Sequence, residues 1–188
     1  MVPDWKLAND NDVPPTPWSY WVVDGQLLAG AFPGAPDSET HRQKIKLLVD
    51  AGVRNIVNLM EEDEVDRYGR PFVSCEQVAK QLAVPDTVDY VRFPIPDVSI
   101  PTPELMTTIL DHIDLTLALG RPIYIHCWGG VGRTGTVVGC WLLRHKLAMP
   151  GNVLQTIAKL RMQDVKRGHR RSPETAQQRR FVVEWKES

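Results

Sequence analysis

A glycine-rich bend between an apolar strand and a helix most constrains how this chain can fold. The short apolar run at 122–126 predicts a buried strand, and the pattern at 134–147 predicts a helix. Between them, glycines at 129, 130 and 132 allow successive backbone N–H groups to converge on one point. The start of the helix adds its partial positive charge there. The local sequence therefore predicts a strand–bend–helix unit that binds an anion.

Two side chains at this bend carry chemistry. Arg133 offers a planar, permanently charged fork that matches two phosphate oxygens. Cys127 ends the strand among these donors, so we expect its sulfur to be ionised at neutral pH. A thiolate beneath a bound phosphate is a nucleophile aimed at phosphorus. The alternative for Cys127 is a buried, inert cysteine, but the glycines and Arg133 favour the nucleophile.

Strand-like and helix-like patterns alternate along the rest of the chain. Two strands are predicted within 20–30 around the Asp24-Gly25 turn, and further strands at 55–60, 88–93 and 122–126. Helices are predicted at 38–51, 71–84, 103–119, 134–147, 152–163 and 173–186. This alternation predicts a single α/β domain, with a central, mostly parallel, twisted sheet of about four to five strands flanked by helices on both faces.

The N-terminal residues differ in composition from the rest. Residues 1–19 are rich in Pro, Asn and Asp, and we expect them to form an arm that packs through Trp5 and Trp18. The remaining residues, 20–188, are expected to form one domain, because 188 residues with 43% hydrophobic side chains suit a single packed unit.

Composition excludes several classes of protein. The apolar runs fall short of the roughly 18 residues of a membrane span, and the N-terminus lacks the pattern of a secretory signal. Three cysteines do not make a disulfide framework, so we expect a cytoplasmic location. A net charge of −1 gives no reason to expect nucleic acid as a partner, and no zinc-ligand spacing occurs. No metal or cofactor is therefore expected.

A basic cluster interrupts this balanced charge. Residues 166–171 read Lys-Arg-Gly-His-Arg-Arg. They predict either a solvated connection between helices or an anion-attracting rim beside a functional pocket.

The C-x5-R-[ST] pattern from Cys127 to Thr134 resembles the signature loop of the cysteine-dependent protein tyrosine phosphatase superfamily. The short chain resembles the dual-specificity branch of that superfamily, particularly its small bacterial-type members. The resemblance covers roughly 20–187, and it includes 28–34 and 58–59, which are similar to segments of the small members. In low-molecular-weight phosphatases and arsenate reductases the loop lies near the N-terminus, whereas here it lies two-thirds along the chain.

The resemblance implies phosphomonoester hydrolysis through a cysteinyl-phosphate intermediate, on a dual-specificity phosphatase-like fold. It implies that Thr134 faces the sulfur and helps it to leave, and that His126 hydrogen-bonds the loop backbone and supports the thiolate from behind. The residues implied to bind the substrate phosphate are Trp128, Gly129, Gly130, Val131, Gly132 and Arg133.

A general acid is needed because an alkoxide or phenoxide leaves slowly without a proton. Asp97 is the candidate, since it lies in a Pro-rich loop at 94–103 after a predicted strand, similar to the acid loop of the family. Such a loop could close over substrate. An exposed turn aspartate is the alternative for Asp97, and Asp89, Asp111 and Asp114 are poorer candidates.

A glutamine near the C-terminus is the candidate for positioning the attacking water. The segment 172–181 resembles the family segment that carries this glutamine, and Gln178 is the closer match. Gln177, or a glutamine that is merely solvated, remains an alternative.

The substrate class stays open at this stage. The short chain predicts a shallow pocket, a dual-specificity protein phosphatase and a phosphorylated protein or peptide as its partner. An inositol-phosphate or phosphoinositide phosphatase is the alternative, since the basic cluster could bind a polyanion. A catalytically inactive phosphate-binding module and a rhodanese-like sulfur carrier are rival classes. The oligomeric state is left open.

Overall fold

The computed structural model describes residues 5–9 and 11–187, which form a five-stranded sheet with helices on both faces. The strand order is β1-β2-β5-β3-β4. Strand β1 is antiparallel to β2, and the other neighbouring pairs are parallel. The strands are β1 (Ser19–Val23), β2 (Leu27–Ala31), β3 (Asn55–Asn58), β4 (Asp89–Arg92) and β5 (Ile123–Cys127). The predicted fold class is therefore confirmed.

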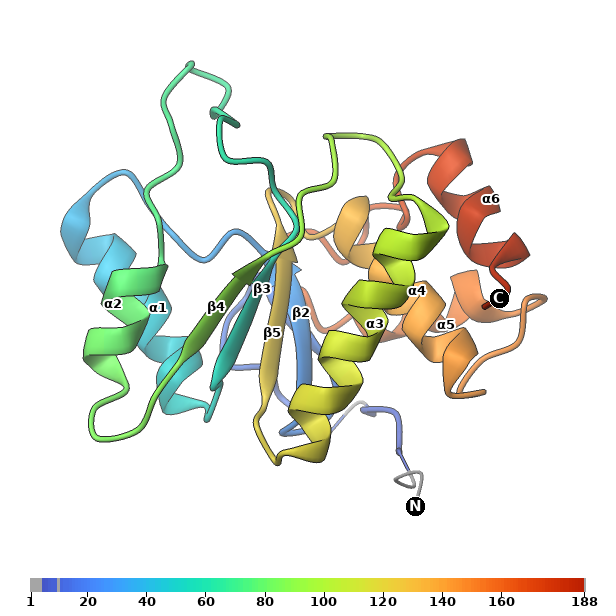
Figure 1. Cartoon of the computed structure of the whole chain (residues 1–188), viewed down its shortest axis with the longest axis horizontal. Helices are drawn as coiled ribbons and strands as arrows, with labels where there is room; N and C mark the ends of the chain where they lie inside the picture. The colour runs from blue at the N-terminus through green and yellow to red at the C-terminus, as the bar shows by residue number, and fades with distance from the viewer. Residues whose placement is uncertain (1–4, 10, 188) are drawn as a thin grey trace.

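The helices form two layers. The helices are α1 (Ser38–Asp50), α2 (Glu76–Leu82), α3 (Pro103–Ala118), α4 (Arg133–Arg144), α5 (Val153–Arg161) and α6 (Ala176–Glu184). Helices α1 and α2 cover one face of the sheet, and α3, α4, α5 and α6 lie on the other (Figure 1). Parallel sheets need this cover on both faces because their strands are apolar on both sides.

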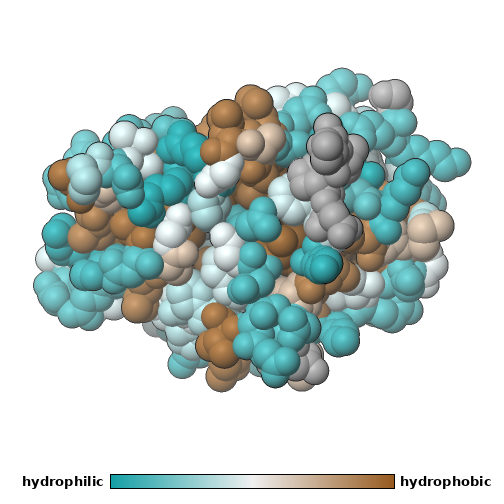
Figure 2. Space-filling view, turned by 90° about the horizontal axis from the view of Figure 1, so that it is seen from below, coloured by the Kyte–Doolittle hydropathy of each residue, from teal (hydrophilic) through white to brown (hydrophobic). Residues whose placement is uncertain are grey.

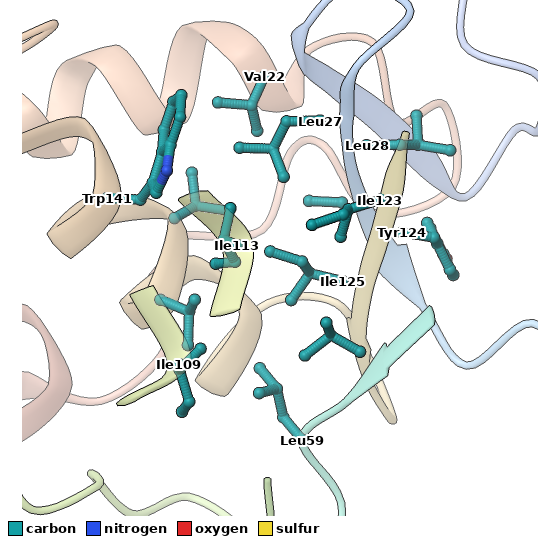
Figure 3. Packing of buried hydrophobic residues seen from close by; sticks show 14 of the residues in the cluster. Val22, Leu27, Leu28, Leu59, Ile109, Ile113, Ile123, Tyr124, Ile125 and Trp141 are labelled. Atoms are coloured by element: carbon teal, nitrogen blue, oxygen red, sulfur yellow. The ribbon is translucent and has the colours of Figure 1, made fainter. Parts of the chain in front are cut away.

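Strand β5 lies at the centre of the core, between β2 and β3, and all five of its residues are buried. Ile123 and Ile125 point toward the side of Ile113 and Trp141, whereas Tyr124 points to the opposite face (Figure 3). This alternation follows from the two-residue period of a strand. It fixes the rotation of β5 and therefore the direction in which the chain leaves it.

The carboxyl ends of β2, β3, β4 and β5 meet at one edge of the sheet. Ala31 of β2 pairs with Cys127, and Asn58 of β3 pairs with His126. The long loops after β3 and β4 rise from the same edge (Figure 1). In open α/β sheets this edge is where ligands bind, so Cys127 leaves the sheet at the expected place for a site.

Two predicted helices begin later than the sequence pattern indicated. The helix predicted from 71 begins at Glu76, because Pro71 pairs with Val65 in an isolated β-bridge. The helix predicted from 173 begins at Ala176, because Thr175 is its N-cap and accepts a hydrogen bond from the Gln178 amide.

The described part of the N-terminal arm packs against the domain. The Trp5 ring meets the Trp141 ring edge-on, with 5.8 Å between centroids. The Trp18 ring lies 4.6 Å from the Lys44 Nζ. Residues 1–4 and 10, which the arm prediction also included, lie outside the described residues.

The surface seen from below, where the parallel strands begin, mixes hydrophilic residues with small hydrophobic patches (Figure 2). Among the described residues, every helix is too short or too polar to cross a lipid bilayer.

Candidate active site

Cys127 is the last residue of β5 and lines a cavity of about 840 Å³. The residue is 3% exposed. Residues 128–132 turn beneath this cavity, and α4 begins at Arg133 with Gly132 as an N-cap that supplies no side-chain hydrogen bond. The first amides of α4 are thus left for a ligand.

Three carbonyl groups of this loop are bonded to residues outside it. Trp128 O accepts from the Phe32 amide at 3.0 Å, and Val131 O accepts from Ser172 Oγ at 2.6 Å. Gly130 O accepts from Nη1 of Arg161, which is completely buried.

The amide groups of the same loop have the opposite role. Within the described residues, none of the N–H groups of 128–132 donates a hydrogen bond to the protein. Buried or half-buried amides without partners are costly, and an anion at the centre of the loop would satisfy them. Together with the N-terminus of α4, they make an anion-binding concavity.

Arg133 is clamped beside this loop by Glu64. Both terminal nitrogens of Arg133 bond the two Glu64 carboxylate oxygens, with Nη2 to Oε2 at 3.0 Å. Nη1 also donates to Ile95 O at 3.0 Å. Burial opposes the charge of Arg133, but its hydrogen bonds to Glu64 and the neighbouring negative charges outweigh this effect and raise the pKa of Arg133. The guanidinium is therefore a fixed, permanent cation at the cavity floor.

Asp97 lies in the loop after β4 and reaches the same cation. Its Oδ1 is 2.9 Å from Nη2 of Arg133, and its side chain is 52% exposed. The three other aspartates considered as acids pair elsewhere: Asp89 with Arg121, and Asp111 and Asp114 with Arg144.

His126 precedes Cys127 in β5, and Thr134 follows Arg133 in α4. Thr134 is fully buried, and its hydroxyl has no hydrogen-bond partner among the described residues. The fully buried His126 ring stacks on Tyr124, and its Nδ1 lies 3.4 Å from Cys127 O. Burial lowers the pKa of His126 to about 3, so this imidazole is neutral at physiological pH.

Gln178 lies against the loop, whereas Gln177 is exposed. A Cβ added to Gly132 would meet the Gln178 amide at 3.0 Å. The Oε1 of Gln178 accepts from the Thr175 amide at 3.1 Å, and its Nε2 donates to Ser99 O at 2.9 Å. Gln178 thereby connects α6 both to the loop that carries Asp97 and to the glycine bend.

Comparisons with known proteins agree with this geometry. A family model described as "Polymorphic toxin system, DSP-PTPase phosphatase" matches residues 34–147, more than half of the chain. The chain belongs to this DSP-PTPase phosphatase family. It is therefore a member of the cysteine-dependent protein tyrosine phosphatase superfamily, as its signature loop predicted.

Two curated relatives of this phosphatase are named for lipid substrates. It is 31% identical over 129 residues to "Phosphatidylglycerophosphate phosphatase PTPMT2" of Arabidopsis thaliana, covering 68% of this chain and 49% of that protein. It is 27% identical to "Phosphatidylglycerophosphatase and protein-tyrosine phosphatase 1" of Homo sapiens, covering 76% of this chain and 64% of that protein. The phosphatase thus spans about half the length of the plant relative.

Solved structures share the fold. Kinase associated phosphatase (KAP) with its catalytic cysteine substituted by serine superposes with a TM-score of 0.66 at 21% identity, covering 83% of each chain. PTPMT1 in complex with PI(5)P gives a TM-score of 0.64 at 21% identity, covering 89% of this chain and 93% of that one.

The cavity of this phosphatase extends well beyond Cys127 and is rich in cations. The basic side chains that line it, besides Arg133, are Lys44, Arg67, Arg70, Lys166, Arg167 and Arg170. Three members of the basic cluster at 166–171 therefore face the cavity, which agrees with the rim interpretation of that cluster. Trp128 is 38% exposed and packs edge-on against Phe72, so it contributes to the aromatic part of the wall.

Sequence reasoning missed two residues that hold this site together. Glu64 was hidden in an acidic loop with several equivalent carboxylates, and Arg161 stood near the end of a helix with no distinguishing pattern. The other two cysteines are inert by comparison, since burial raises the pKa of Cys75 to about 12 and raises that of Cys140 well above its usual value. Within the described residues, no three His, Cys, Asp or Glu side chains are grouped to hold a metal ion.

Proposed function

We propose that this phosphatase hydrolyses phosphate monoesters in two steps, with Cys127 as the nucleophile. The observation that carries the proposal is the loop itself: three of its carbonyls are bonded to residues outside it, its amides have no partner among the described residues, and Glu64 holds Arg133 beside it. This arrangement matches a tetrahedral dianion seated over the sulfur.

In the first step, the Cys127 thiolate attacks phosphorus while Arg133 and the amides of 128–132 hold the equatorial oxygens. An arriving phosphate competes with Asp97 for Nη2 of Arg133, so substrate binding releases the Asp97 carboxyl toward the leaving oxygen. Once released from Arg133, the Asp97 carboxylate takes up a proton from solvent, and it donates this proton to that oxygen as the P–O bond breaks and the P–S bond forms.

In the second step, the cysteinyl-phosphate is hydrolysed. Asp97, now ionised, accepts a proton from water as the water oxygen attacks phosphorus. Gln178 supports this step because its amide lies between the Asp97 loop and Gly132. Thr134 supports it because its unpartnered, buried hydroxyl is available to donate to the departing sulfur.

The preferred substrate is proposed from the charge of the cavity. Seven basic side chains and three acidic side chains line it, which supports a polyanionic phosphomonoester. Phosphotyrosine and phosphoserine/threonine proteins are the second candidate class, supported by the exposed aromatic rings of Tyr68 and Trp128 at the rim.

We also propose that 20–188 is the phosphatase domain and 1–19 an arm that packs on it.

Hydrolysis of p-nitrophenyl phosphate tests the chemistry. We expect turnover that is insensitive to EDTA. The Cys127→Ser variant should have no turnover but should still bind phosphate. Asp97→Asn should slow alkyl phosphates, which have poor leaving groups, far more than p-nitrophenyl phosphate. Equal slowing of both substrates would remove Asp97 from its role, and full activity of Cys127→Ser would overturn the proposal.

A further inference from the structure

Three cations that line the cavity have no carboxylate partner. Lys44 comes from α1, and Lys166 and Arg167 come from the segment after α5. Among the described residues, none of these side chains lies within ion-pair distance of an acid. We call this group of three residues the second cationic cluster.

The acids that line the cavity are already used by other cations. Asp97 is bound to Arg133 at 2.9 Å. Asp66 pairs with Arg70 at 2.6 Å, and Glu174 pairs with Arg170 at 2.5 Å. The unbalanced positive charge of the cavity is therefore concentrated in the second cationic cluster and in Arg67, which lies over the ring of Tyr68.

Lys44 is held in place although it lacks a counter-ion. Its Nζ donates to Gly34 O at 2.7 Å and lies 4.6 Å from the centroid of the Trp18 ring. Burial lowers the pKa of Lys44, and the positive charge of Arg167 lowers it further. A half-buried ammonium beside a like charge is unfavourable, and an anion between the two would stabilise both.

Arg161 links the backbone of one member of this cluster, Arg167, to the catalytic loop. One terminal nitrogen of Arg161 donates to Gly130 O in the loop, and the other donates to Arg167 O at 2.7 Å. The Arg167 amide is bonded in turn to Asp164 Oδ1 at 2.9 Å. One buried side chain thus connects Arg167 to the loop that carries Cys127, which favours a substrate with two anionic groups at a defined separation.

We propose that Lys44, Lys166 and Arg167 form a second phosphate subsite, and that the preferred substrate is a small molecule carrying two phosphate monoesters. One phosphate lies over Cys127 and is hydrolysed, and the other is held by the cluster. This inference rests on the proposed function, since it assigns the substrate class of the same cavity. A small molecule suits the cluster better than a peptide, because Lys44 lies in the wall of the cavity and a ligand must enter to reach it.

The test compares matched monophosphates and bisphosphates. Propanediol, butanediol and hexanediol bisphosphates are assayed against propyl, butyl and hexyl phosphate with the wild-type chain. We expect kcat/KM to be at least about tenfold higher for one bisphosphate than for its monophosphate, because a charge-assisted contact to a second phosphate contributes that much. The chain length that gives the maximum reports the distance between the two sites.

Variants then assign the effect to the cluster. Lys44→Gln and Arg167→Gln should each lower the ratio of the bisphosphate kcat/KM to the monophosphate kcat/KM by about tenfold, mainly through KM. Lys44→Arg should restore most of the ratio. The charge-matched controls are Lys46→Gln on α1 and Arg171→Gln in the basic cluster, whose side chains do not line the cavity, and they should leave the ratio unchanged.

A binding measurement separates this inference from the proposed chemistry. Calorimetry with butanediol bisphosphate and the Cys127→Ser chain should detect binding that is at least about tenfold weaker once Lys44→Gln is added. This loss of affinity would support the subsite even if no phosphomonoester is hydrolysed. The absence of hydrolysis would contradict only the proposed function. Equal ratios in wild type, Lys44→Gln and the controls would overturn the subsite.

Discussion

Two adjacent glycines of the catalytic loop should respond very differently to the same substitution. Gly130 has a φ of +66°, and a Cβ added there would lie 2.6 Å from both Ala31 N and Gly30 O. Gly129 has room, since its added Cβ would meet only a Val131 methyl group at 3.9 Å. Gly129→Ala is therefore a matched control for Gly130→Ala.

The magnitude follows from what the added methyl group would contact. Gly30 and Ala31 belong to β2, which is paired to β5, so the loop rather than the strand has to move. Ordinary contact begins at 3.4 Å, which requires a displacement of about 1 Å. A left-handed alanine costs about 1–2 kcal/mol, and overpacking adds about 1–3 kcal/mol.

A shift of about 1 Å in catalytic groups lowers rates by about 100-fold. We therefore expect kcat/KM of Gly130→Ala on p-nitrophenyl phosphate to fall by about 100-fold, equivalent to about 2.7 kcal/mol, and Gly129→Ala to stay within about threefold of wild type. In urea unfolding experiments, the free energy of unfolding should fall in Gly130→Ala but not in Gly129→Ala. Similar activity and stability in the two variants would refute the argument that contact with β2 holds the loop in its anion-binding form.

Three further predictions concern the residues around the loop. Glu64→Gln should lower kcat by about 10- to 100-fold, because Arg133 loses a charge-assisted partner. Glu62→Gln, in the same acidic loop but exposed, is the control. Equal kcat values in the two variants would contradict the role of Glu64 in holding Arg133. In Arg161→Lys, one ammonium group replaces a guanidinium that bonds two carbonyls, so the free energy of unfolding of the variant should fall by about 1–3 kcal/mol. Inorganic phosphate should also inhibit the variant more weakly. Wild-type values for both measurements would contradict the proposal that Arg161 supports the loop. His126 remains neutral in the folded chain down to a pH of about 3, whereas the unfolded chain takes up this proton below a pH of about 6.5. Stability should therefore fall with decreasing pH between those values, with a slope from His126 that approaches about 1.4 kcal/mol per pH unit. Urea unfolding across this range should show a shallower pH dependence for His126→Asn, and an unchanged slope would exclude this contribution.

Local patterns predicted the elements of the fold well where neighbouring residues determine the backbone. The Asp-Gly turn between β1 and β2, the helix that begins after Thr102, and the passage from β5 through the glycine bend into α4 all follow from short-range geometry. The helix start expected at 71 was wrong because a long-range feature intervened, namely the bridge between Val65 and Pro71, and the helix begins at Glu76. Periodicity alone does not reveal such a bridge.

The candidate site divides in the same way. Cys127 and Arg133 stand on one continuous segment, so their proximity is a consequence of the strand–bend–helix geometry that the sequence itself determines. Glu64, Arg161 and Lys44 belong to other segments, and similar charged residues surround each of them in the sequence. Which of these side chains meets the loop depends on how the sheet order β1-β2-β5-β3-β4 brings distant segments to one edge. The sequence thus determined the anion-binding bend and its nucleophile. Only the tertiary structure decided which distant charged residues bind Arg133, support the bend and line the cavity. Those contacts depend on how the elements pack and not on neighbours along the chain.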